Sequence, residues 1–246
     1  MEMKASFITE LLDLGTKAFA GRDFDKAIAD FTVAIQLDPQ SATAYAWRGA
    51  SYGNRGDRDK AIADFTEAIR LAPNYAHAYY SRGLTYERRG DHDQAIADFT
   101  VAIQLDPKDA KAYYNRGVAS EHKGDHDQAI ADFTIAVQLV PQSAEAYYNR
   151  GVAYVNKGDH DNAIADYTEA IRLDPRNASL YRERGRAYGE KRDYDKAIAD
   201  CTEAIRLGPK DALAYHNRGC AYGRKGEHNK AKLDLDEATR LGCDPE

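Results

Sequence analysis

The chain has 246 residues, 43% of them apolar, and a formal net charge of −6. An apolar fraction of this size can build a packed core, which argues against disorder, and a mildly acidic chain has no general attraction to nucleic acid or anionic membranes. No apolar run approaches about 18 residues, so we expect no membrane partner, and acidic residues interrupt the apolar N-terminal stretch, unlike a secretory signal. Three widely spaced cysteines fit a reducing compartment, and we therefore expect a cytoplasmic location.

Proline marks a repeat that runs along the whole chain. The prolines at 39, 73, 107, 141, 175 and 209 are each 34 residues apart. A fixed period of this length indicates a repeat architecture. With proline at position 32 of each repeat, we expect an N-terminal extension over 1–7 and a single array over 8–245. The expected repeats are 8–41, 42–75, 76–109, 110–143, 144–177, 178–211 and 212–245.

Each repeat has the pattern of two short helices. In the fourth repeat, Tyr113 and Gly117 lie on one face of a first helix, and Ala129 and Phe133 lie on one face of a second. The sequence KGDHD between them offers a glycine to end the first helix and Asp125 to cap the second. Helices of about 13 residues are marginal alone in water, so we expect packing between neighbours to hold them, as in a solenoid.

This pattern resembles the tetratricopeptide repeat (TPR) family. Tyrosine recurs at position 4 in six repeats, glycine at position 8 and alanine at position 20 in all seven, and an aromatic residue at position 24 in five. The resemblance covers residues 8–245. It implies an all-α fold, an α-solenoid of seven helix-turn-helix repeats that form a right-handed superhelix. It also implies a non-enzymatic scaffold that binds a protein or peptide segment.

One position departs from the family pattern. Position 7, usually leucine in the family, is Leu14 in the first repeat and arginine in the other six, while position 23 is aspartate in all seven. Since these positions flank the packed faces of their helices, we expect each arginine to pair with one of these aspartates, within or between repeats. Partly exposed pairs of this kind would each contribute about 0–1 kcal/mol. A row of arginines that anchors a ligand is the alternative.

The first helices of TPR solenoids line a concave groove, and the positions that face it carry three successive tyrosines here. Tyrosine offers contact area at a low entropic cost, and asparagine can both donate to and accept from a peptide backbone. The tyrosines are alternatively copies left by recent duplication of the repeat. The expected peptide-binding surface, centred on the third to fifth repeats, consists of Tyr80, Tyr114, Tyr148, Lys111, Asn115, Asn149, His122 and Asn156.

Several kinds of chemistry are not expected. The groove positions carry five basic and six acidic residues, which argues against a nucleic-acid partner. The short motifs of nucleotide-binding and hydrolytic enzymes are absent, so we expect no catalytic residue and no cofactor. Four histidines recur at position 17, one in each of four repeats, and this spacing is too wide for a shared metal ion. We therefore expect no metal site.

A second function remains open on the sequence alone. Phe7, Leu11, Leu12 and Leu14 crowd the first helix with apolar side chains. An exposed apolar patch of this kind favours association. The alternative to a peptide-binding adaptor is therefore a self-assembling scaffold, a homo-oligomer formed through its terminal repeats. An amplified or engineered array without a dedicated ligand is a further possibility.

Overall fold

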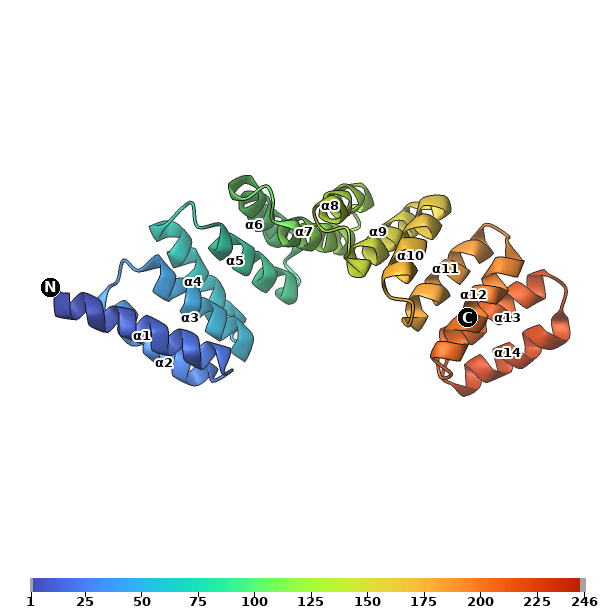
Figure 1. The fold of residues 1–246 in the computed structure, drawn as a ribbon, viewed down its shortest axis with the longest axis horizontal. Helices are drawn as coiled ribbons and strands as arrows, with labels where there is room; N and C mark the ends of the chain where they lie inside the picture. The colour runs from blue at the N-terminus through green and yellow to red at the C-terminus, as the bar shows by residue number, and fades with distance from the viewer. Residues whose placement is uncertain (1, 244–246) are drawn as a thin grey trace. The chain divides into compact units, whose positions relative to one another are not determined.

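The computed structural model describes residues 2–243, and within this range every regular element is an α-helix (Figure 1). The helices up to residue 123 are α1 (Glu2–Ala20), α2 (Phe24–Leu37), α3 (Ala42–Arg55), α4 (Arg58–Leu71), α5 (Ala76–Arg89), α6 (His92–Leu105) and α7 (Ala110–Lys123). Those beyond it are α8 (His126–Leu139), α9 (Ala144–Lys157), α10 (His160–Leu173), α11 (Ala178–Glu190), α12 (Tyr194–Leu207), α13 (Ala212–Arg224) and α14 (His228–Arg240). None of the helices within residues 2–243 has the length and apolar character of a membrane span.

The chain divides into two compact units, one ending at Lys123 and the other beginning at Gly124. In each unit, every helix packs against the next one along the chain. Alternate helices also touch: α3 contacts both α1 and α5, α5 contacts α7, and α11 contacts α13. The architecture is an all-α solenoid in which the odd-numbered helices are the first members of successive pairs. Residues 2–7, expected as an extension before the first repeat, form the beginning of α1.

The turns within the pairs contain a residue with positive φ, and in several of them an aspartate then caps the second helix. Gly158 ends α9 with φ of 84°, and the Asp159 side chain then accepts a hydrogen bond of 3.2 Å from the backbone N–H of Asn162. Glycine adopts this left-handed conformation without steric cost. At the same position of the repeat, Arg22 and Arg192 adopt φ of 62° and 64°. A side chain in this conformation costs about 1–2 kcal/mol.

The core lies between the helices of each pair, where rings pack against glycines. A Cβ added at Gly151 would lie 2.7 Å from Cε1 of Tyr167, which is too close for two carbon atoms. A Cβ added at Gly83 would likewise lie 2.9 Å from Cε1 of Phe99. Both rings are fully buried. Glycine at position 8 therefore allows the ring at position 24 to fill the space between the two helices.

The predicted pairing of arginine with aspartate is confirmed. Arg150 donates two hydrogen bonds of 2.7 Å to the carboxylate of Asp166 on the second helix of its own pair. A third bond, of 3.1 Å, reaches Thr134 on the second helix of the preceding pair. Arg150 thus connects three helices. The same arrangement recurs for Arg48 with Asp64 and Thr32, Arg82 with Asp98 and Thr66, Arg184 with Asp200 and Thr168, and Arg218 with Asp234 and Thr202.

These ion pairs are less exposed than we expected. The side chains of Arg150 and Asp166 are 16% and 6% exposed. The carboxylate of Asp166 raises the pKa of the Arg150 guanidinium, mainly through their hydrogen bonds. Burial raises the pKa of the Asp166 carboxyl, and the bonds from Arg150 oppose this effect. Removing one partner of such a pair costs about 3–5 kcal/mol, because the other charge stays buried, even where the net contribution of the intact pair is small.

Candidate peptide-binding surface

Tyr80, the first of the three expected tyrosines, is half-buried on α5. Its ring centroid lies 5.8 Å from that of Phe99, so the side chain covers a core ring instead of projecting into solvent. Its hydroxyl accepts a hydrogen bond of 3.1 Å from Nδ2 of Asn115 on α7. Burial raises the pKa of Tyr80. The structure thus brings together two of the predicted residues, one from each of two adjacent first helices.

The other predicted residues of this unit lie along α7. Asn115 also donates from Nδ2 to the backbone carbonyl of Lys111 at 2.8 Å, and the Lys111 side chain is exposed in the first turn. Tyr114 is half-buried. His122 lies in the last turn, about 16 Å from Lys111 along the helix, and contacts Glu87. His122 is therefore separated from the Tyr80–Asn115 contact.

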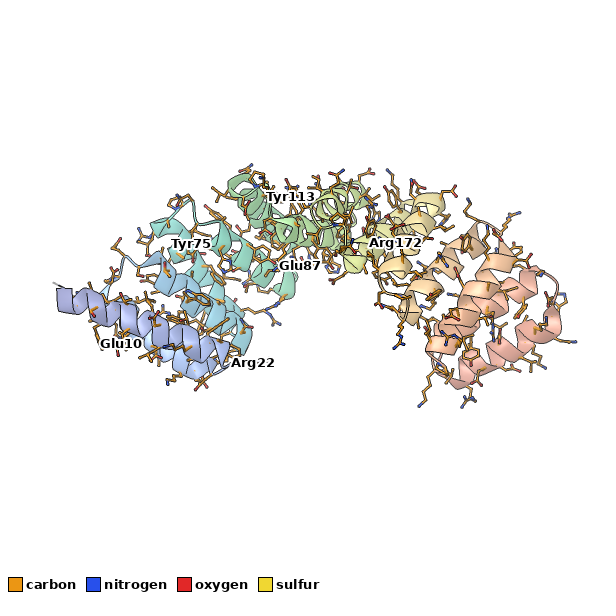
Figure 2. The ribbon with its side chains drawn as sticks, viewed as in Figure 1. Glu10, Arg22, Tyr75, Glu87, Tyr113 and Arg172 are labelled. Atoms are coloured by element: carbon orange, nitrogen blue, oxygen red, sulfur yellow. The ribbon has the colours of Figure 1, made fainter. Side chains whose placement is uncertain are left out.

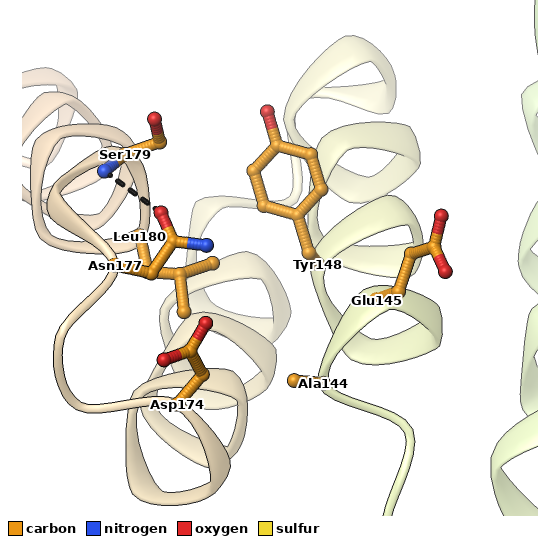
Figure 3. A pocket seen from close by; sticks show the side chains of 7 residues that line it. All are labelled: Ala144, Glu145, Tyr148, Asp174, Asn177, Ser179 and Leu180. Carbon is orange, nitrogen blue, oxygen red and sulfur yellow. Dashed lines mark hydrogen bonds between the residues drawn. The ribbon is translucent and has the colours of Figure 1, made fainter.

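Tyr148 lies on α9 in the second unit and borders a hollow of about 410 Å³. Its ring centroid lies 6.0 Å from that of buried Tyr167. Across the hollow are Asn177 and Ser179, joined by a hydrogen bond of 3.2 Å from the Ser179 N–H to Oδ1 of Asn177 (Figure 3). The floor includes Leu180, which is buried. Tyr148 therefore presents one part of its ring to the core and another to an open space.

The remaining two predicted residues also lie on α9. Asn149 is half-buried and follows Tyr148 directly, whereas Asn156 is exposed near the C-terminal end of the helix. Neither lines the hollow beside Tyr148. All eight predicted residues thus lie on α5, α7 or α9, which are first helices, and Tyr148 is the member of the set that borders this hollow.

A second hollow, of about 240 Å³, was not predicted as part of the surface. It lies between α11 and α13, and its lining includes Arg186, His216, Asn217, Cys220 and Arg224. Sγ of Cys220 is 3.5 Å from Nε2 of His216. The sequence signal for it was present, because Arg186, Asn217 and Arg224 occupy groove positions. The prediction was centred on the third to fifth repeats because of their tyrosines, and it therefore did not include this hollow.

One pair of histidines that the spacing argument did not compare lies close together. The ring centroids of His92 and His122 are 5.2 Å apart, and both imidazoles contact the carboxylate of Glu87 (Figure 2 labels Glu87 on α5). The spacing argument compared histidines at position 17 only. His122 occupies position 13 of the next repeat, on a helix that contacts α5. A comparison of different positions in adjacent repeats would have found this cluster.

Sequence comparison supports the fold-level interpretation. Models described as tetratricopeptide repeat, or TPR repeat, match residues 48–110, 99–131, 122–158, 144–177, 178–211 and 201–232. Together these matches run without a gap from residue 48 to residue 232. The chain belongs to the tetratricopeptide repeat family. No curated protein sequence matches this TPR chain significantly.

Solved structures of other TPR proteins resemble this one. YrrB, described as a TPR protein with an unusual peptide-binding site, is 25% identical, with a TM-score of 0.70 over 76% of this chain and 96% of its own. MamA is 28% identical, with a TM-score of 0.65 over 71% of this chain and 96% of its own. The C-terminal part of a TPR repeat-containing protein from Cytophaga hutchinsonii is 18% identical, with a TM-score of 0.80 and 96% coverage of both chains, and this likeness supports the fold alone.

Proposed function

We propose that this TPR protein is a non-enzymatic scaffold that binds protein or peptide segments along its first helices. The hollow beside Tyr148 is the observation that carries the proposal. The similarity of the chain to YrrB, a TPR protein with an unusual peptide-binding site, supports the same class of function. The three free cysteines fit a cytoplasmic location, which we propose with it.

The lining of the hollow suits one side chain of an extended peptide. The Tyr148 ring and Leu180 offer apolar contact, and Asn177 and Asp174 place polar groups at the other side. Binding sites of this kind combine an apolar wall with a few polar groups that fix orientation. We infer that an apolar or aromatic peptide side chain enters the hollow while the peptide backbone contacts the polar groups.

In the first unit, the Tyr80–Asn115 contact supports a separate part of the proposed surface. Both N–H groups of the Asn115 amide are used, one by the Tyr80 hydroxyl and one by the Lys111 carbonyl. The orientation of this amide is therefore fixed, and its oxygen is left to accept a hydrogen bond from a peptide N–H. The exposed ammonium of Lys111, one turn away, favours an acidic side chain in the same peptide.

A selected peptide tests the proposal for the hollow. Peptides are selected from a random library against the full chain, and their affinity is measured by fluorescence anisotropy. We expect Ser179→Trp, which fills the hollow, to weaken binding by at least about tenfold, or 1.4 kcal/mol. Gln138→Trp on α8 is the matched control, because Gln138 is an exposed residue of a second helix. Equal affinity for both variants would reject the hollow as the binding site.

Lys111 has a matched control within the same unit. Lys111→Ala should weaken an acidic peptide, and the loss should shrink as salt concentration rises, because exposed charges are screened. Lys108→Ala removes another exposed cation, from the loop before α7, and should leave the affinity unchanged. A similar loss for both variants would indicate a general charge effect and not a site at Lys111.

Self-assembly through the first repeat is the second candidate, and two exposed side chains favour it. Phe7 and Leu14 on α1 are 49% and 40% exposed and lie two helical turns apart, on the same face. Leu11 is buried against Ala34, so it is not part of this patch. Light scattering over a range of concentrations distinguishes the two functions. A mass that stays that of one chain in both the protein and its Phe7→Ser variant would remove this candidate.

A further inference from the structure

Three side chains that can bind a metal ion converge at one end of α5. Nδ1 of His92 lies 2.9 Å from Oε2 of Glu87, and Nδ1 of His122 lies 2.5 Å from Oε1 of the same carboxylate. One ligand atom from each residue lies within 4.8 Å of the other two. Glu87 thus stands between two imidazoles, one on each side.

The repeat explains why the three residues meet. Glu87 is in the last turn of α5 and His92 begins α6, so the tight turn at Gly90 brings them together. His122 is in the last turn of α7, a first helix that contacts α5. The neighbouring acidic residue Asp91 is paired with Arg89 and is not part of the cluster. Three helices therefore hold the ligands, all within the unit that ends at Lys123.

We propose that Glu87, His92 and His122 bind one Zn²⁺ ion or a similar divalent transition metal. Two imidazoles and one carboxylate form an established type of ligand set for zinc, at about 2.0–2.2 Å from the ion. Tetrahedral geometry at these bond lengths places ligand atoms about 3.3 Å apart. The present spread of up to 4.8 Å requires an inward movement of about 1.5 Å at most. His122, which is 56% exposed, has the room to make this movement.

The present hydrogen bonds prepare the ligands for the ion. The Glu87 side chain is only 13% exposed, and its two oxygens each orient one imidazole. A metal ion at this point takes the place of the hydrogen bonds between the carboxylate and the imidazoles, and each imidazole coordinates it through a ring nitrogen that carries no proton. Three protein ligands leave a fourth coordination position for water or for a side chain of a bound partner.

The natural repeats supply substitutions that keep the fold. His92→Tyr introduces a tyrosine, the residue that Tyr194 supplies at the same position of its own repeat. His122→Asn introduces an asparagine, the residue that Asn156 supplies at the position equivalent to His122. Glu87→Gln removes the charge with little change of shape. His160→Tyr is the matched control, since it makes the same replacement at position 17 of another repeat.

Zn²⁺ binding is measured by isothermal titration calorimetry on the full chain. The parent protein and all variants carry Cys220→Ser, so that the thiol beside His216 does not bind the ion. We expect one equivalent of Zn²⁺ to bind the parent protein and the His160→Tyr control. His92→Tyr, His122→Asn and Glu87→Gln should each weaken binding by more than about tenfold, because loss of a direct ligand costs at least as much as loss of an outer partner.

Circular dichroism and the exchange of the α5 and α7 amides check that each variant is folded. Zn²⁺ should also slow exchange at the ends of α5 and α7 in the parent protein, because the ion joins the two helices. The proposal is overturned if the parent binds no zinc, or if folded variants of the three residues bind it as tightly as the parent. In either case, the two imidazoles serve only to hydrogen-bond Glu87.

Discussion

Replacing Leu14 by arginine should stabilise the first helix pair. Asp30 occupies the position of the paired aspartates, but Leu14 stands where the other repeats have arginine. Oδ2 of Asp30 is buried without a hydrogen-bond partner, and Leu14 leaves 40% of its surface exposed. Leu14→Arg therefore supplies the missing donor and removes an exposed apolar side chain in one step.

The structure sets the size of the effect. In the existing pairs, such as Arg48 with Asp64, two bonds of 2.7 and 2.8 Å join the partners. A buried, unsatisfied polar atom costs about 1–3 kcal/mol. Two charged hydrogen bonds would add to the stabilisation gained by satisfying this atom. Fixing the arginine side chain in one conformation opposes that gain by up to about 2 kcal/mol. We expect a net increase of about 1–2 kcal/mol in the free energy of local unfolding.

Amide hydrogen exchange is the suitable assay, because repeat proteins open locally and a single midpoint averages over the array. Amides of α1 and α2 should exchange about 5–30 times more slowly in Leu14→Arg, whereas those of α13 and α14 should not change. In an Asp30→Asn background the gain should largely disappear. An undiminished gain in that background, or no change in α1 and α2, would refute the argument from the unpaired carboxylate.

Three further substitutions or reactions follow from buried or strained groups. Tyr167→Phe should raise stability by about 1 kcal/mol in urea unfolding, because the buried hydroxyl has no partner; a loss of stability would reveal a bond to that hydroxyl. Arg192→Gly should add about 0.5–1 kcal/mol by relieving φ of 64°, and an unchanged unfolding midpoint would mean that this turn is not strained. Burial raises the pKa of the Cys201 thiol to about 12, so at pH 8 it stays protonated and should react with a thiol reagent only after unfolding, whereas exposed Cys220 should react in the native protein. Equal native rates for the two thiols would contradict this assignment of burial.

The helical pairs and the arginine–aspartate ladder could be predicted from sequence because each depends on a contact that recurs with the repeat. Proline, glycine and alanine at fixed positions define the helix ends and their close approach. The flank positions of Arg150 and Asp166 place them on facing helices of one pair. The extent to which this pair is buried could not be predicted, since it depends on the threonine and the rings that surround it on neighbouring helices.

The site was harder to predict because it depends on contacts that occur once. A helical wheel places Tyr80 on the groove side but does not show that its ring packs against Phe99. The Glu87–His122 contact joins different positions of adjacent repeats, and a comparison of equivalent positions misses it. The missing arginine at Leu14 was visible in sequence, but the buried oxygen of Asp30 required the packing of α1 on α2.

A hydrogen-exchange footprint of a selected peptide on the full chain tests the central proposal most directly. A peptide that binds along the first helices should protect α9 and α11 around the hollow beside Tyr148, or α5 and α7 around the Tyr80–Asn115 contact. The even-numbered helices α6, α10 and α12 should show no comparable protection. Protection confined to those second helices, or no binding by any selected peptide, would contradict the proposed function.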